Sequence, residues 1–389
     1  MTDTSKLHAN LAIPSTSSLR TAQRRLLALL EVTGPLTRSE LADLARLPLT
    51  TAAGAIGELL GQRLVLERES GPRSHQAGRP PRTLEATGPP RVVAMVARRG
   101  SDLHLTVVTL TGELVADRTE ALSGSGPVKQ HLHDPEPVLP AAGRLVLGTL
   151  NETGIRPARL AGVVVSVARP RPQDTDITPL QAQLEAPVVA ENDANLGALG
   201  EATFGAGRGL DSFVYVMLGH GIGAGMVFGG RLHRGAAGFA GELAHVQVRE
   251  QEGGPACACG GRGCLAMVMG PSLHEFVSRA WAQRLSVPEV LSLAADREPG
   301  VRRVFADLGR TVGRPLADLC TMLDPAAVVV DGSFGAAGEP VMAGIREAID
   351  RHSAPAVADS VRVLPGELGD RAEILGAAAL VRQRTLDQT

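Results

Sequence analysis

The sequence predicts an α/β protein in which a small module of helices and one hairpin precedes a larger two-lobed domain. Three observations carry this prediction. Apolar residues recur at helical spacing between residues 19 and 66. A short linker at 87–91 contains glycine and two prolines and marks a change of pattern. Beyond it, apolar strand-like runs and helical segments occur in two successive groups, which indicates two lobes around a cleft.

Three short helices are expected in the N-terminal module. The first places Leu26, Leu29 and Leu30 on one face and stops at Gly34-Pro35. The second opens with a capping-box pattern from Thr37 to Glu40, and we expect its inward face to carry Leu41, Leu44 and Ala45. The third starts with Pro48 in its first turn and ends at Gly61.

Two short strands should follow, at Leu64–Leu66 and Arg82–Glu85, around a stretch rich in Gly, Pro and Arg. Three helices and a hairpin make a winged helix-turn-helix over residues 19–86, whose third helix enters the DNA major groove. The expected DNA-binding residues are Thr50 and Thr51 on that helix and Arg79 in the wing. A helical dimerisation or capping module is the alternative, which the Arg-rich wing disfavours.

Composition is that of an ordinary globular protein, with 44% hydrophobic and 21% charged residues. The net charge is −2, although residues 1–91 carry a small basic excess that suits contact with nucleic acid. Residues 1–18 are polar and are expected to form a disordered tail rather than a signal peptide. No run of about 18 apolar residues occurs, so we expect a cytoplasmic protein without a membrane partner.

The second domain, residues 92–389, is expected to begin with strands, a helix near 138–153 and a further buried strand. A second group of strands follows, and later helices are expected near 271–283, 300–323 and 340–352. The expected strands are Val92–Val96, Leu103–Leu110, Leu160–Val167, Phe213–Leu218, Gly225–Phe228 and Val328–Val330.

Three of the four cysteines cluster as Cys257, Cys259 and Cys264, with glycines between them that allow a tight loop. His245 precedes them at a spacing suited to a fourth ligand. Three thiolates and one imidazole suit tetrahedral Zn²⁺, and a full set of protein ligands indicates a structural ion. Free buried cysteines are the alternative, which the clustering disfavours.

The run from His245 to Cys264 resembles the signature of the ROK family, named for repressors, open reading frames and kinases. Three further stretches are similar to that family: Glu191–Asn195, Gly219–Gly225 and Gly238–His245. The similarity covers residues 92–385, and the winged helix extends it to the repressor branch. It implies that the second domain is actin-like and sugar-kinase-like, with a ribonuclease H-like fold in each lobe.

The resemblance also implies a sugar site. Asn192, Asp193 and Glu242 would bind vicinal hydroxyls, and His245 would bond a hydroxyl while its other nitrogen holds zinc. In the family's kinases the residue at Asp193 is the general base. The alternative for Asn192-Asp193 is a polar turn before a helix, with Asp193 as the N-cap.

The chain departs from the kinase pattern at the first phosphate loop. Kinases of the family carry Asp-x-Gly-Gly-Thr, whereas Ala97-Arg98-Arg99-Gly100-Ser101 stands here. The magnesium-binding Asp is lost and an arginine fills a glycine position, so we expect no ATP binding and a vestigial Asp193. His220 and the shorter region 168–180 also depart from the pattern, and the usual run of glycines is thinned near Asp331-Gly332-Ser333. Ala266 replaces a sugar-contacting glutamate.

These observations predict a DNA-binding regulator, a repressor of sugar uptake or metabolism genes, acting as a homodimer or dimer of dimers. Its partners would be a double-stranded operator and a sugar or sugar-phosphate effector, sensed without phosphorylation. An active ATP-dependent sugar kinase and a ligand-independent regulator with a vestigial sugar site remain the alternatives.

Overall fold

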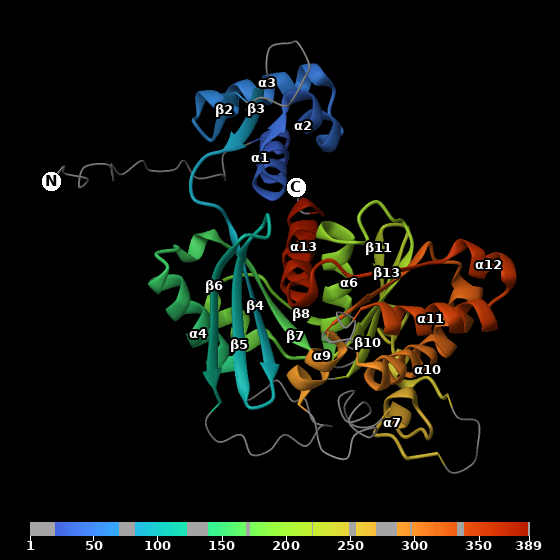
Figure 1. Ribbon diagram of the computed structural model, residues 1–389. Helices are drawn as coiled ribbons and strands as arrows, with labels where there is room; N and C mark the ends of the chain where they lie inside the picture. Colours follow the sequence, from blue (N-terminus) through green and yellow to red (C-terminus); the bar gives the residue numbers. More distant parts are fainter. Residues whose placement is uncertain are drawn as a thin grey trace. The chain divides into compact units, whose positions relative to one another are not determined.

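The computed structural model describes residues 20–69, 82–122, 139–168, 172–219, 221–248, 254–269, 286–295, 298–332 and 338–387 (Figure 1). The chain divides into two compact units. The first contains residues 1–92, 109–113 and 381–389, and the second contains residues 93–108 and 114–380. The expected tail at residues 1–18 and the wing residue Arg79 lie outside the described residues.

The first unit is a winged helix-turn-helix, as the sequence predicts. Its helices are α1 (Thr21–Thr33), α2 (Arg38–Ala45) and α3 (Leu49–Gly61). Its strands are β1 (Leu36–Thr37), β2 (Val65–Glu69) and β3 (Arg82–Ala86), paired antiparallel in the order β1-β3-β2. Strand β1 was not expected. It is too short to show in the sequence pattern and exists because the returning strand β3 pairs with it.

The capping box of α2 forms as expected, because Thr37 accepts from the Glu40 amide and Glu40 accepts from the Thr37 amide. The expectation that Leu44 faces inward is wrong, since this residue is 50% exposed. Leu41, Ala42 and Ala45 centre the buried stripe of the helix, which puts Leu44 to its side. Pro48 is also the N-cap of α3 rather than a residue of its first turn.

The first lobe of the second unit is a five-stranded sheet in the order β6-β5-β4-β7-β8. Strands β5 and β6 are antiparallel, and β7 and β8 are parallel. Every residue of β7 is buried, which explains its continuous apolar sequence. The elements are β4 (Val92–Arg99), β5 (Asp102–Thr109), β6 (Leu114–Ala121), α4 (Leu139–Glu152), β7 (Leu160–Val167), α5 (Thr178–Leu184) and β8 (Val188–Asn192).

The second lobe repeats this topology with the sheet order β11-β10-β9-β12-β13. In both lobes a meander of three strands adjoins two strands that come later in the chain, and this duplication defines the actin-like, ribonuclease H-like fold. The strands are β9 (Phe213–Leu218), β10 (Ile222–Phe228), β11 (Arg231–His233), β12 (Ala327–Asp331) and β13 (Arg362–Pro365).

Helices accompany the second sheet, and α6 (Asp193–Phe204) contacts β9 and β10. The others are α7 (Leu265–Met269), α9 (Val287–Ala295), α10 (Pro299–Leu323), α11 (Glu339–His352), α12 (Pro355–Ser360) and α13 (Ala372–Asp387). The helix expected near 271–283 lies outside the described residues.

Helices α10 and α11 lie side by side along the second lobe (Figure 1). Gly309 permits this approach, because a Cβ there would stand 2.1 Å from the carbonyl oxygen of Val341. The core beneath these helices is mostly valine and leucine, with Phe305 from α10 fully buried. Within the described residues, no helix is both long and apolar enough to cross a bilayer.

Candidate functional site

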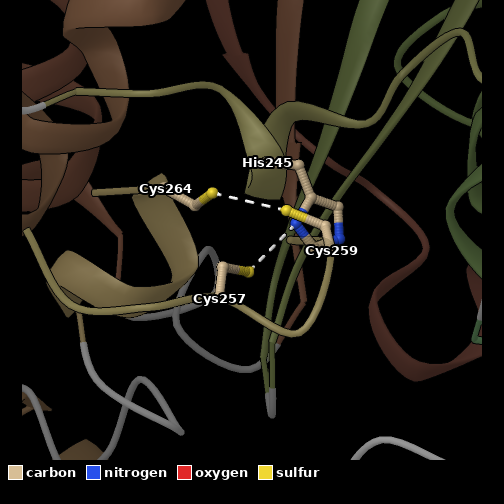
Figure 2. A group of neighbouring side chains, drawn as sticks. All are labelled: His245, Cys257, Cys259 and Cys264. Carbon is tan, nitrogen blue, oxygen red and sulfur yellow. Dashed lines mark hydrogen bonds between the residues drawn. The ribbon is translucent and has the colours of Figure 1, made fainter. Parts of the chain in front are cut away.

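One cluster of metal-ligand side chains lies within the described residues: His245, Cys257, Cys259 and Cys264 (Figure 2). Their ligand atoms all fall within 4.8 Å of one another. The Cys257 sulfur lies 3.5 Å from His245 Nδ1, and the sulfurs of Cys259 and Cys264 are 3.6 Å apart. The four side chains can therefore hold a single metal ion between them.

The backbone around the cysteines folds into a tight loop. Gly260 and Gly263 adopt φ values of 91° and 68°, which favour glycine over any residue with a Cβ. The Cys257 amide donates to the Gly261 carbonyl at 2.8 Å, closing the loop. The amide of Gly261 also donates to the Cys259 sulfur and lowers the pKa of that thiol.

The third thiol of this loop, that of Cys264, behaves differently. Burial of Cys264 raises the pKa of its thiol to about 12. Because metal ions bind thiolates, an ion in the cluster would displace the proton of this thiol and would balance the negative charge of the resulting thiolate. The metal-binding capacity of the cluster rests on its geometry and its donor atoms, three sulfurs and one imidazole nitrogen within reach of a single ion.

Asn192 and Asp193 lie where β8 ends and α6 begins. The Asn192 side chain accepts from the Asn195 amide at 3.0 Å, so Asn192 is the N-cap. The alternative with Asp193 as N-cap is therefore wrong: Asp193 is the first helical residue and accepts from the Ala194 amide at 2.8 Å. The helix thus starts one residue earlier than that alternative required. Asn192 has the extended backbone angles of an N-cap, and Asp193 already belongs to the helix.

Asp193 at the start of α6 lies close enough to Glu242 for their charges to interact, and Glu242 in turn lies beside His245. Glu242 precedes the short 3₁₀ turn Leu243–His245, and its carboxylate lies 3.9 Å from His245 Nε2. Burial raises the pKa of Glu242. Burial also raises the pKa of Asp193, to about 7, and the negative charges of Glu373 and Glu242 reinforce the shift. The carboxyl groups of Asp193 and Glu242 thus lie near one another, and Glu242 is next to the Cys/His cluster.

Glu373, on the first turn of α13, was not expected at this site. Arg99 Nη2 donates to Glu373 Oε2 at 2.6 Å, and the Ser166 hydroxyl donates to Glu373 Oε1. Arg99 ends β4 and Ser166 lies on β7, so the carboxylate ties both strands to α13. No short-range sequence signal could have found Glu373, because it lies 207 residues from Ser166 and 274 from Arg99.

The expected DNA-binding residues divide between described and undescribed parts of the chain. Thr50 and Thr51 are exposed on the first turn of α3. Arg79 and the loop residue His220 lie outside the described residues. The outer face of α3 also carries Gly54 and Gly57, where an added Cβ would meet open space.

A winged helix-turn-helix combined with a duplicated actin-like domain and a Cys/His cluster places the chain in the class of winged-helix proteins with a sugar-kinase-like domain. The chain belongs to the ROK family, whose profile matches residues 155–384.

The xylose repressor of Bacillus subtilis is 25% identical over 94% of this chain and 96% of its own length. A glucokinase of Streptomyces coelicolor is 33% identical over 53% of this chain and 71% of its own length.

Solved structures with this fold come from both regulators and kinases. A ROK family transcriptional regulator, described as a homolog of the E. coli MLC protein, matches 94% of this chain and 96% of its own with a TM-score of 0.73 and 22% identity. The ROK glucokinase of Streptomyces griseus, in complex with glucose and AMPPNP, covers 75% of this chain and 99% of its own at TM-score 0.62 and 26% identity.

Proposed function

We propose that the protein is a DNA-binding transcriptional regulator, a repressor of sugar uptake or metabolism genes, whose kinase-like domain senses a sugar without phosphorylating it. The observation that carries this proposal is the winged helix-turn-helix on a ROK domain. The similarity to the B. subtilis xylose repressor supports it, because that similarity extends over nearly the whole of both chains and includes the winged helix. The glucokinase of S. coelicolor matches only 53% of this chain in sequence.

The DNA-binding surface in this proposal is the exposed start of α3 together with the wing. Thr50 and Thr51 would contact phosphates or thymine methyl groups in the major groove, and Arg79 would enter the minor groove. Few long side chains extend from α3, so one copy would bind weakly. A homodimer or a dimer of dimers would place several winged helices on one operator, and their linked binding would raise the overall affinity for DNA.

The effector site comprises Asn192, Asp193, Glu242 and His245. Carboxylate and amide groups form paired hydrogen bonds with vicinal hydroxyls, which suits a sugar. A sugar that binds one arrangement of the lobes better than the other would shift the protein towards that arrangement and change its affinity for DNA.

The metal in the Cys/His cluster would be Zn²⁺ with a structural role. Tetrahedral zinc with Zn–S bonds near 2.3 Å separates its sulfur ligands by roughly 3.8 Å. The separation of 3.6 Å between Cys259 and Cys264 is close to that value. His245 turns Nδ1 towards Cys257 and Nε2 towards Glu242, so zinc at Nδ1 would orient the ring at the effector site.

Absence of phosphoryl transfer is part of the proposal. Ala97 stands where kinases of the family carry the magnesium-binding Asp, and it is a buried residue of β4. Arg99 follows where a small residue is usual, and it is paired with Glu373. Phosphoryl transfer depends on a bound metal ion and on positioned phosphates. Ala97 offers no ligand for the metal ion, and Arg99 does not provide the close backbone approach that a glycine would allow to phosphate.

A DNA-binding experiment followed by sugar titration tests the proposal. The full-length protein should select a repeated DNA motif from a random duplex library and release it in the presence of one sugar from a panel that includes xylose and glucose. Glu242→Ala should abolish the heat of sugar binding and the release while DNA binding persists. A protein that selects no DNA contradicts the proposal, and selection without any sugar response supports the ligand-independent regulator.

A sugar kinase is the second candidate, because a carboxyl with a pKa of about 7 suits a general base near neutral pH. A coupled assay with ATP, Mg²⁺ and the same sugars separates the candidates. Turnover that disappears in Asp193→Asn would support the kinase and contradict sensing without phosphorylation.

A further inference from the structure

An ion pair adjoins the candidate effector site, and its arginine lies in the stretch that replaces the family's first phosphate loop, Ala97–Ser101. Arg99 Nη2 lies 2.6 Å from Glu373 Oε2. The Glu373 side chain is only 16% exposed, and its second oxygen accepts from the Ser166 hydroxyl. Both oxygens of the carboxylate are thus engaged, and the guanidinium already has its counter-ion.

A second guanidinium near the site is also matched. Arg234 donates to Glu191 Oε2 through Nε at 2.9 Å and through Nη2 at 2.6 Å. Glu191 is buried and directly precedes Asn192. The positive charge of each of these two arginines is thus already balanced by a carboxylate of the protein.

The first turns of α6 and α13, whose amino termini could attract an anion, already carry acidic residues of the protein. Asp193 accepts from the Ala194 amide on α6, and Glu373 lies in the first turn of α13. Asp193 is close enough to Glu373, Glu242 and Arg99 for all three charges to act on it. The charges that act on Asp193 are thus the carboxyl groups of Glu373 and Glu242 and the paired guanidinium of Arg99.

We infer that the effector is an uncharged sugar, and that the Arg99–Glu373 pair excludes phosphorylated sugars from the site. This inference rests on the proposed function. A phosphate entering beside β4 would meet the negative charges of Glu373 and Asp193, whereas the charge of Arg99 is already balanced by Glu373. A neutral sugar leaves the pair intact and uses the free lone pairs of the remaining carboxyl groups.

Calorimetric titration of the full-length protein with matched probes tests the inference. The probes are glucose with glucose 6-phosphate, and N-acetylglucosamine with its 6-phosphate; xylose is added as a neutral pentose. The wild type should bind a neutral sugar at least about tenfold more tightly than the matching phosphate, the difference that one charge-assisted contact makes. Equal or tighter binding of the phosphate overturns the inference alone. Binding of no probe overturns the proposed effector site and the inference with it.

Glu373→Gln supplies the decisive variant. It removes the repulsion and releases Arg99, so the preference for the neutral sugar should shrink by about tenfold. In the double variant Arg99→Gln/Glu373→Gln the affinity for the phosphorylated sugar should fall again, because the guanidinium that Glu373→Gln releases is no longer present. Glu339→Gln removes the partner of Arg302 in another pair of the same 2.6 Å length and should leave the preference unchanged.

Arg99→Gln provides an independent arm if Glu373→Gln melts below the assay temperature. It leaves Glu373 without a counter-ion, so the preference for the neutral sugar should widen. An unchanged preference in whichever of these variants folds overturns the inference.

Discussion

Arg234 and Glu191 form a two-point ion pair: both Nε and Nη2 of the arginine donate to Glu191 Oε2, at 2.9 Å and 2.6 Å. Glu191 lies at the end of β8, and its other oxygen accepts from the Asn195 side chain at 3.0 Å. Arg234 follows β11 and begins the segment that leads to Glu242. The pair thus joins the two chain segments that supply the candidate effector site.

Arg234→Ala should destabilise the protein strongly, by about 3–5 kcal/mol, because it leaves a buried carboxylate without its partner. Thermal or urea unfolding of the full chain measures the loss. Arg234→Ala/Glu191→Gln should recover part of it, since the unpaired charge is removed. A single variant within about 0.5 kcal/mol of wild type would show that the pair contributes little.

Cys259→Ser should lower the bound zinc from one ion per chain towards none, because a hydroxyl is a far poorer ligand than a thiolate. Metal analysis after desalting measures the content. Cys320→Ser is the matched control, since Cys320 is buried in α10 outside the cluster. Equal zinc in both variants, or none in the wild type, would contradict a zinc centre at His245, Cys257, Cys259 and Cys264.

Asp193→Asn should stabilise the fold at pH 8 and have little effect at pH 4. The pKa of Asp193 is raised from 3.8 to about 7 in the folded state, so the folded protein prefers the neutral carboxyl. Stability from this group is therefore present below pH 4 and declines as pH rises towards 7. The gain should be on the order of 1–2 kcal/mol, reduced by partial exposure of the side chain. Melting curves of wild type and Asp193→Asn at pH 4 and pH 8 measure this gain in stability. An equal gain at both pH values would contradict the raised pKa of Asp193.

Gly54→Ala should stabilise the winged helix by about 0.5–1 kcal/mol, because a helical glycine with open space around it gains from an added methyl group. If α3 enters the major groove, the same methyl group lies in the interface and should weaken DNA binding.

Gly148→Ala in α4 is the control for Gly54→Ala, since its added Cβ also meets open space. It should stabilise its own helix and leave DNA affinity unchanged. Unfolding curves and fluorescence anisotropy with the selected duplex give the two readings. Undiminished DNA affinity in Gly54→Ala would argue against α3 as the recognition helix.

Local patterns were sufficient for much of the secondary structure. Strands β7 and β9 have the expected bounds, because continuous apolar runs leave little choice of ends. The capping box of α2 also forms as expected, since Thr37 and Glu40 need only each other. Side-chain direction was harder to predict. Leu44 fits an apolar helical spacing but is exposed, because the packing of α2 selected the stripe that contains Ala42.

By itself, the sequence determined the fold class and the set of four metal-ligand side chains, because both depend on patterns along the chain and on residue chemistry at close spacing. Only the tertiary structure decided that Glu373 lies beside Asp193 and pairs with Arg99. Burial and charge act through space, so the electrostatics of the site depend on residues that are hundreds of positions apart. The sequence alone left a sugar and a sugar phosphate both open, and our inference of an uncharged sugar rests on these residues.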